Sequence, residues 1–259
     1  MTAIGVFDSG VGGLTVVAAL KQHLPRESIL FLGDTARLPY GTKSPDTVIR
    51  YTRRNVDFLA RRGVKAVVVA CNTASALALA SLDLQLPTWG VVEPGARRAA
   101  AIATRHVVVL ATESTVASQA YPRAIRRHRT DLEITSIACP LFVPLVEEGW
   151  QDDPVAVEIA RRYLQPVLDL EVDTVVLGCT HYPLLTSTLR QVTGPEIEFV
   201  DSANSTAVHV AEELSRLGLD ETTSTADDHY CTTDAAERFE HIAARILQRQ
   251  EVLLEHVDL

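Results

Sequence analysis

Short apolar runs alternate along the chain with longer segments whose apolar residues recur every three or four positions. The apolar runs lie at residues 3–7, 29–32, 64–70, 87–92, 106–111, 133–138, 174–178 and 197–200. Runs of this length are typical of strands buried in a parallel sheet, and the longer segments are typical of helices. Their regular alternation predicts an α/β fold with doubly wound parallel sheets.

The predicted helices follow the strands. The first helix ends near residue 24. One helix follows residues 112–115, and another begins at residue 184. The others span about 45–62, 73–82, 93–103, 139–149, 154–170, 203–217 and 234–249. Ser44 and Pro45 suit the N-cap and first position of the second helix. Segments 33–41 and 218–229 are predicted to be loops because turn-forming or polar residues dominate them. The last residues give no clear signal.

Two of the apolar runs end in a cysteine, and polar residues follow each one. Residues 67–70 lead into Cys71, and residues 175–178 lead into Cys179. The polar residues behind them are Asn72 and Thr73, and Thr180 and His181. Open parallel sheets bind ligands at the carboxyl ends of their strands. The two halves of the chain therefore share a plan, without a further residue-level repeat, and we expect both cysteines to face one substrate.

The first strand leads into a glycine-rich turn. The glycines of residues 10–13 follow the pattern G-x-G-G instead of G-x-G-x-x-G, so a dinucleotide site is weakly supported. A tight strand-to-helix turn that presents Asp8, Ser9 and several backbone N–H groups fits better. Asp8 has two interpretations, a cap for the following helix or a partner in chemistry.

Composition narrows the function classes. The 259 residues are 47% hydrophobic and 22% charged, with a net charge of −9, which argues against a nucleic-acid surface. No apolar run reaches the length of a membrane span, and the N-terminal residues lack the pattern of a signal peptide. We therefore expect a cytoplasmic protein with reduced cysteines. The wide cysteine spacing matches no zinc motif.

A lone buried cysteine usually acts as a small apolar side chain, and Cys139 and Cys231 are interpreted in this way. Cys71 and Cys179 are different because polar groups and a helix start follow each one, which favours thiolate. Two thiols on opposite walls suit the movement of a proton between the faces of a carbon acid. A catalytic disulfide is the less favoured alternative, because such pairs usually form C-x-x-C motifs.

Six motifs in order resemble the cofactor-independent glutamate racemases. They are DSGVGGLTV (8–16), GDTARLPYG (33–41), ACNTAS (70–75), GVVEPG (90–95), ACPLFVPLVEEG (138–149) and GCTHYPLL (178–185). The resemblance covers essentially the whole chain. It implies two doubly wound α/β domains that face each other across the active site, the second (96–203) inserted into the first (1–95 and 204–259).

The resemblance also implies the site residues. Cys71 and Cys179 become the catalytic acid–base pair, supported by Asp8, His181 and Glu147. The expected substrate contacts are Asp8, Ser9, Pro39, Tyr40, Gly41, Asn72, Thr73, Thr115, Thr180 and His181. Residues 111–115 read A-T-E-S-T, where the family usually has G-T-x-G-T, so both threonines match the family pattern and both glycines are replaced.

The expected function is interconversion of L- and D-glutamate, which supplies D-glutamate for peptidoglycan. No cofactor, metal, nucleic acid or membrane partner is expected, and formation of a homodimer stays open. Two alternatives also stay open. One is an aspartate racemase of the same superfamily, and the other is a non-catalytic dicarboxylate-binding module, which would need neither thiol.

Overall fold

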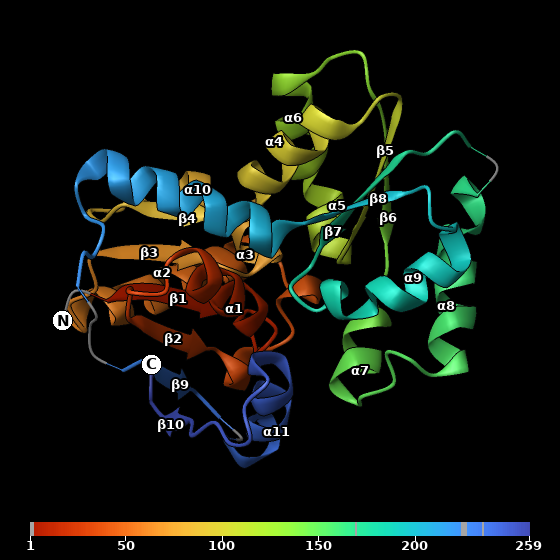
Figure 1. Cartoon of the computed structure of the whole chain (residues 1–259). Coiled ribbons are helices and arrows are strands. Elements are labelled where there is room, and N and C mark those ends of the chain that lie inside the picture. Colours follow the sequence, from red (N-terminus) through yellow and green to blue (C-terminus); the bar gives the residue numbers. More distant parts are fainter. Residues whose placement is uncertain (1–2, 169, 224–226, 235) are drawn as a thin grey trace.

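Two separate parallel sheets carry the fold of the computed structural model, which describes residues 3–168, 170–223, 227–234 and 236–259 (Figure 1). The first sheet has six strands in the order β10-β9-β2-β1-β3-β4. Their bounds are Ile4–Asp8 (β1), Ile29–Gly33 (β2), Ala66–Val69 (β3), Thr88–Gly90 (β4), His229–Thr232 (β9) and Glu255–His256 (β10). Each neighbouring pair is parallel.

The second sheet has four parallel strands in the order β6-β5-β7-β8. Their bounds are His106–Ala111 (β5), Glu133–Ala138 (β6), Thr174–Gly178 (β7) and Glu198–Asp201 (β8). All four lie between β4 and β9 along the chain, so the second unit is inserted into the first. This confirms the predicted fold class. The exact boundaries at residues 95/96 and 203/204 stay a prediction.

Both sheets wind in the same way. The chain passes from β1 to β2 on one side and then to β3 and β4 on the other, and β5 to β8 repeat this order. The direction of winding therefore reverses beside β1 and β3 in one sheet, and beside β5 and β7 in the other. Such reversal points are where open α/β sheets bind ligands. Cys71 and Cys179 follow β3 and β7, so each lies at the reversal point of its sheet.

Helices cover both faces of each sheet. Their bounds are Leu14–His23 (α1), Pro45–Arg61 (α2), Asn72–Leu77 (α3), Val92–Ile102 (α4), Glu113–Ser118 (α5), Ala120–His128 (α6), Phe142–Glu147 (α7), Pro154–Leu164 (α8), Thr186–Thr193 (α9), Ser202–Leu217 (α10) and Ala236–Leu247 (α11). In the first unit, α1, α10 and α11 pack on one face, and α2 and α3 pack on the other. In the second unit, α7, α8 and α9 lie opposite α4 and α6.

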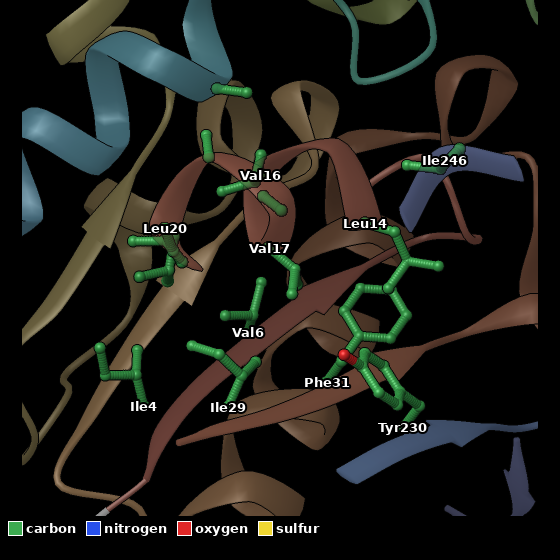
Figure 2. Packing of buried hydrophobic residues seen from close by; sticks show 14 of the residues in the cluster. Ile4, Val6, Leu14, Val16, Val17, Leu20, Ile29, Phe31, Tyr230 and Ile246 are labelled. Carbon is green, nitrogen blue, oxygen red and sulfur yellow. The ribbon is translucent and has the colours of Figure 1, made fainter. Parts of the chain in front are cut away.

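The core explains why the strands read as continuous apolar runs. Figure 2 shows Val17 of α1 packed over Val6 of β1, with Val16 farther from the strand. All three side chains are buried. Because helices cover both faces, every residue of β1, β2, β3, β5 and β7 is buried whichever way it points. Each large apolar side chain that is buried contributes about 1.5–3 kcal/mol.

Several predicted helices are shorter than expected. The helix predicted to reach residue 170 ends at Leu164 and continues as the 3-10 turn Gln165–Val167, because Pro166 has no N–H to extend the ladder. The helix predicted for 73–82 ends at Leu77. The helical segment after Thr115 is divided at Gln119, which has a left-handed backbone with φ of 55°.

Two smaller differences concern a loop and a short strand. Loop 33–41 contains the 3-10 turn Thr35–Arg37, and a second turn, Tyr40–Thr42, overlaps its end. Strand β10 gave no signal because it has only two residues. Residues 169, 224–226 and 235 fall in predicted segments but lie outside the described residues. Among those described, no helix has the length and hydropathy that a membrane span needs.

Candidate active site

A cavity of about 270 Å³ lies where the carboxyl ends of the two sheets meet. The first unit contributes Ser9, Gly10, Leu38, Pro39, Tyr40, Gly41, Thr42, Cys71, Asn72 and Thr73. The second contributes Thr112, Glu113, Pro140, Val143, Pro144, Glu147, Cys179, Thr180 and His181. Both cysteines therefore line one cavity, one from each sheet. Of the predicted site residues, Asp8 and Thr115 do not line it.

Cys71 stands between β3 and α3. It occupies the N-cap position of α3, and its sulfur accepts a hydrogen bond from the backbone N–H of Ala74 at 3.5 Å. The Ser9 hydroxyl lies 3.5 Å from the same sulfur. Burial, followed by the charge of Asp8, raises the pKa of Cys71 to about 12. Near neutral pH, Cys71 is therefore a protonated thiol that can donate.

Asp8 lies behind the glycine turn that follows β1. Its Oδ2 atom accepts hydrogen bonds from the N–H groups of Gly10 and Gly13, both at 3.1 Å. The carboxyl therefore shapes the turn before α1. Oδ1 has no hydrogen-bond partner in the part of the chain that the structure describes. Burial raises the pKa of Asp8, although the charge of His181 partly opposes the shift. These hydrogen bonds fit a structural role for Asp8 at the start of α1, and its part in the chemistry stays a prediction.

Cys179, His181 and Glu147 form a chain of contacts on the other wall. The Cys179 sulfur lies 3.9 Å from Nδ1 of His181. Nε2 of the same ring lies 3.3 Å from Oε1 of Glu147, which is ion-pair distance without hydrogen-bond geometry. Burial alone would lower the pKa of His181, but Cys179 and Glu147 outweigh it and raise this pKa to about 10. The imidazole is therefore cationic near neutral pH and stabilises negative charge beside it.

Hydroxyl and amide groups occupy the base of the cavity. Asn72 donates from Nδ2 to the Tyr121 hydroxyl at 2.7 Å, and its Oδ1 has no partner within the described residues. Thr73 Oγ1 lies 2.9 Å from Thr112 Oγ1 and 3.3 Å from Thr115 Oγ1. Thr115 thus lies behind Thr73 and Thr112 and supports them.

Tyr40 lines the cavity, but its hydroxyl is engaged elsewhere. It donates a short hydrogen bond to Asp34 Oδ2, and Asn55 donates to the same hydroxyl at 3.0 Å. Burial and the Asp34 charge raise the pKa of Tyr40 far above its ordinary value. The Tyr40 hydroxyl therefore fixes the loop, and the predicted contact with a substrate falls to other atoms of this residue.

Two contacts beside the cavity join the halves. The Thr15 hydroxyl donates to the carbonyl oxygen of Thr180 at 3.1 Å. The Ser114 hydroxyl donates to the carbonyl oxygen of Gly41 at 2.7 Å. Ser114 stands where the family resemblance leads one to expect glycine. The serine therefore supplies a hydroxyl that reaches Gly41 of the first unit, which a glycine could not do.

Thr112 and Glu113 line the cavity, yet they were not among the predicted site residues. The available signal was their place directly after β5, the strand beside the reversal point of the second sheet.

No lysine or arginine appears among the described lining residues. Nor does any group of three or more His, Cys, Asp or Glu side chains that could hold a metal ion occur in the described ranges.

Known proteins resemble this chain in sequence and in fold. The family model for Asp/Glu/hydantoin racemases matches residues 13–211. A glutamate racemase from Geobacter metallireducens is 51% identical over 250 residues, which covers 95% of this chain and 92% of that protein. A solved glutamate racemase isoform from Bacillus anthracis is 38% identical with a TM-score of 0.96, covering 100% of this chain and 98% of the other. The Francisella tularensis glutamate racemase, solved in complex with D-glutamate, is 33% identical with a TM-score of 0.93, covering 99% and 97%.

Proposed function

This chain belongs to the Asp/Glu/hydantoin racemase family and is an enzyme, and from that premise we propose that it interconverts L- and D-glutamate with Cys71 and Cys179 as its two acid–base groups. One observation carries the mechanism: a single cavity receives one thiol from each sheet. The substrate is assigned from relatives, because the Geobacter metallireducens and Bacillus anthracis proteins are glutamate racemases.

The reaction needs one proton removed and one delivered. The Cys179 thiolate takes the α-proton of L-glutamate, and the electron pair of that bond stays on the α-carbon. The Cys71 thiol then gives its proton to the opposite face, which yields D-glutamate. Cys71 is left as thiolate and Cys179 as thiol, so the next turnover can run in reverse. This assignment of enantiomers rests on the family resemblance.

The resting protonation states fit this direction. Cys71 is a thiol at neutral pH because burial and Asp8 raise its pKa to about 12. The cationic ring of His181 lies 3.9 Å from the Cys179 sulfur and stabilises a thiolate there. A base on one wall and an acid on the other are what a two-base proton transfer requires.

The α-proton of an amino acid is much less acidic than a thiol, so the site must stabilise charge that develops on the substrate. Hydrogen-bond donors aimed at the α-carboxylate can do this in a cavity that excludes water. Asn72, Thr73 and Thr180 line the cavity and can donate. We propose these groups and nearby backbone N–H groups for that role, without assigning a particular carboxylate to each.

We also propose that the D-glutamate enters peptidoglycan synthesis and that the enzyme works in the cytoplasm without a cofactor.

Aspartate is the main rival substrate because the family description includes it. Initial rates with the two amino acids separate these alternatives. Faster racemisation of aspartate would replace the substrate assignment and leave the two-thiol mechanism in place.

The direct test is circular dichroism of D-glutamate incubated with the purified, reduced enzyme. The optical signal should decay to zero as the two enantiomers become equal. Calorimetry on the same sample measures binding. Binding of glutamate with an unchanged optical signal would show a non-catalytic dicarboxylate-binding module and contradict the proposal.

A further inference from the structure

Arg245 of α11 reaches the helix that carries Glu147. Its Nη2 atom donates a hydrogen bond to the carbonyl oxygen of Val146 at 2.7 Å. Ile242 and Ile246 anchor α11 in the core of the first unit, whereas Val146 packs in a core of the second. Figure 1 shows α11 and α7 next to each other, below the place where the two units meet. The contact therefore joins the C-terminal helix of one unit to α7 of the other.

Gly149 leaves the space that the guanidinium occupies. A Cβ atom at residue 149 would lie 2.9 Å from Nη1 of Arg245, and the backbone there has a positive φ of 79°. The N–H of Gly149 also donates to the Val146 carbonyl, at 3.1 Å. This carbonyl thus accepts two N–H groups, one from its own turn and one from the other unit. Together they fix the end of α7.

The end of α7 is directly connected to the acid–base chain on the Cys179 wall. Glu147 follows Val146 and is the last residue of α7. Its Oε1 atom lies 3.3 Å from Nε2 of His181, whose Nδ1 lies 3.9 Å from the Cys179 sulfur. A displacement of the Val146 peptide therefore moves the carboxylate that faces His181.

We propose that Arg245 is a positioning residue for proton transfer at Cys179, because it holds the end of α7 where Glu147 faces His181. The inference rests on the proposed function. Arg245 does not line the cavity, so it acts through Glu147 and His181 and not on the substrate. Cys71 takes its contacts from Ser9 and Ala74 on the opposite wall. Arg245 is thus expected to affect proton transfer at Cys179 and not at Cys71, which is a one-sided effect.

A one-sided effect has a kinetic signature in a racemase. Enantiomers have equal free energies, so any variant must lose kcat/KM by the same factor in both directions. The two directions differ in which proton transfer limits the rate. A higher barrier at Cys179 alone raises the primary deuterium isotope effect on kcat/KM for the enantiomer that Cys179 deprotonates. The isotope effect falls for the enantiomer that Cys71 deprotonates.

The experiment compares Arg245→Ala, Arg245→Lys and the control Arg249→Ala with the wild-type enzyme, using α-protonated and α-deuterated L- and D-glutamate. Among the described residues, Arg249 pairs with Asp228 at 3.6 Å and lies over the Tyr230 ring, both in its own unit. Arg245→Ala should lower kcat about 10- to 100-fold with little change in KM, because small misplacements of catalytic groups are costly. Lysine should restore part of the rate, and Arg249→Ala should keep wild-type isotope effects.

Thermal unfolding verifies that each variant is folded, and Arg245→Gln takes the place of Arg245→Ala if the latter is not. Unchanged rates in the Arg245 variant overturn the proposal. A slower enzyme whose two isotope effects move in the same direction also overturns it, because that result indicates general loosening. If the wild-type enzyme does not racemise glutamate, the proposed function fails before any variants are compared.

Discussion

Gly12 and His181 are in direct contact across the two units. A Cβ atom at residue 12 would lie 2.5 Å from both Nδ1 and Cε1 of the imidazole, and equally close to the Thr180 hydroxyl. The turn after β1 thus forms one wall of the space that holds the His181 ring. Glu147 faces the other ring nitrogen. The absence of a side chain at residue 12 lets the first unit support a proton-transfer group of the second.

Gly12→Ala should therefore displace His181 and slow racemisation, by roughly 100-fold if the ring shifts by about 1 Å. Gly95→Ala is the matched control. The nearest atoms to a Cβ at Gly95 lie 3.5 Å away, which is ordinary contact distance, and residue 95 is helical. Steady-state rates of the two variants make the comparison. Equal activity of both would show that the contact with His181 has no role in catalysis.

Replacement of either catalytic thiol should remove activity. Cys71→Ser and Cys179→Ser should each lose racemisation by several orders of magnitude and stay folded, because a serine hydroxyl is too weak an acid to serve as the base. Cys139→Ser and Cys231→Ser are the controls, since neither sulfur lines the cavity. These two should keep activity per folded molecule. Near-normal turnover in either of the first pair would falsify the two-thiol mechanism.

The two thiols should differ in reactivity. Brief treatment with iodoacetamide at neutral pH should alkylate Cys179 before Cys71, because alkylation needs thiolate and the pKa of Cys71 is raised to about 12. Peptide mapping by mass spectrometry measures both sites. His181→Asn removes the cation beside Cys179 and should reduce the preference, and faster reaction at Cys71 in the wild-type enzyme would contradict the assignment.

The raised pKa of His181, to which Cys179 and then Glu147 contribute, should make stability depend on pH. The pKa of His181 is about 10 in the folded protein, against 6.5 for an ordinary histidine. A raised pKa stabilises the fold fully below the unfolded value, and this stability is lost as the pH rises through about 10. Glu147→Gln should therefore cost most stability near pH 6 and progressively less toward pH 10. Glu148→Gln, at the exposed neighbouring position, is the control.

Denaturant unfolding of both glutamine variants across this pH range makes the measurement. A stability loss in Glu147→Gln that is constant from pH 6 to pH 10 would show that Glu147 stabilises the protein without acting on the charge of His181.

Much of the fold could be predicted because its central strands are buried on both faces. Continuous apolar runs such as residues 106–111 mark such strands, and β5 has these bounds. The positions of Cys71 and Cys179 follow from the same logic, since each stands directly behind an apolar run. Helix ends were less predictable. Pro166 ends a helix because it has no N–H, and Gln119 divides one through its left-handed backbone. Apolar spacing reveals neither.

Contacts between elements that are distant along the chain could not be predicted from local patterns. Glu147 and His181 come from separate elements, and only the packing of α7 against the segment after β7 brings them together. The motif resemblance suggested their shared role without giving the contact. Ser114 and Arg245 gave no local signal at all. Their partners are backbone carbonyl oxygens of the other unit, and any residue type offers such an acceptor.

The central claim is that two separate thiols exchange protons with the substrate, one on each face. The most direct measurement is mass spectrometry of separated L- and D-glutamate at low conversion in deuterated water, started from each enantiomer in turn. The resting acid carries solvent deuterium, so the product should contain α-deuterium while the remaining starting enantiomer stays almost wholly protonated. Product that keeps its original α-hydrogen, or substrate that exchanges faster than product forms, would contradict two thiols acting on opposite faces.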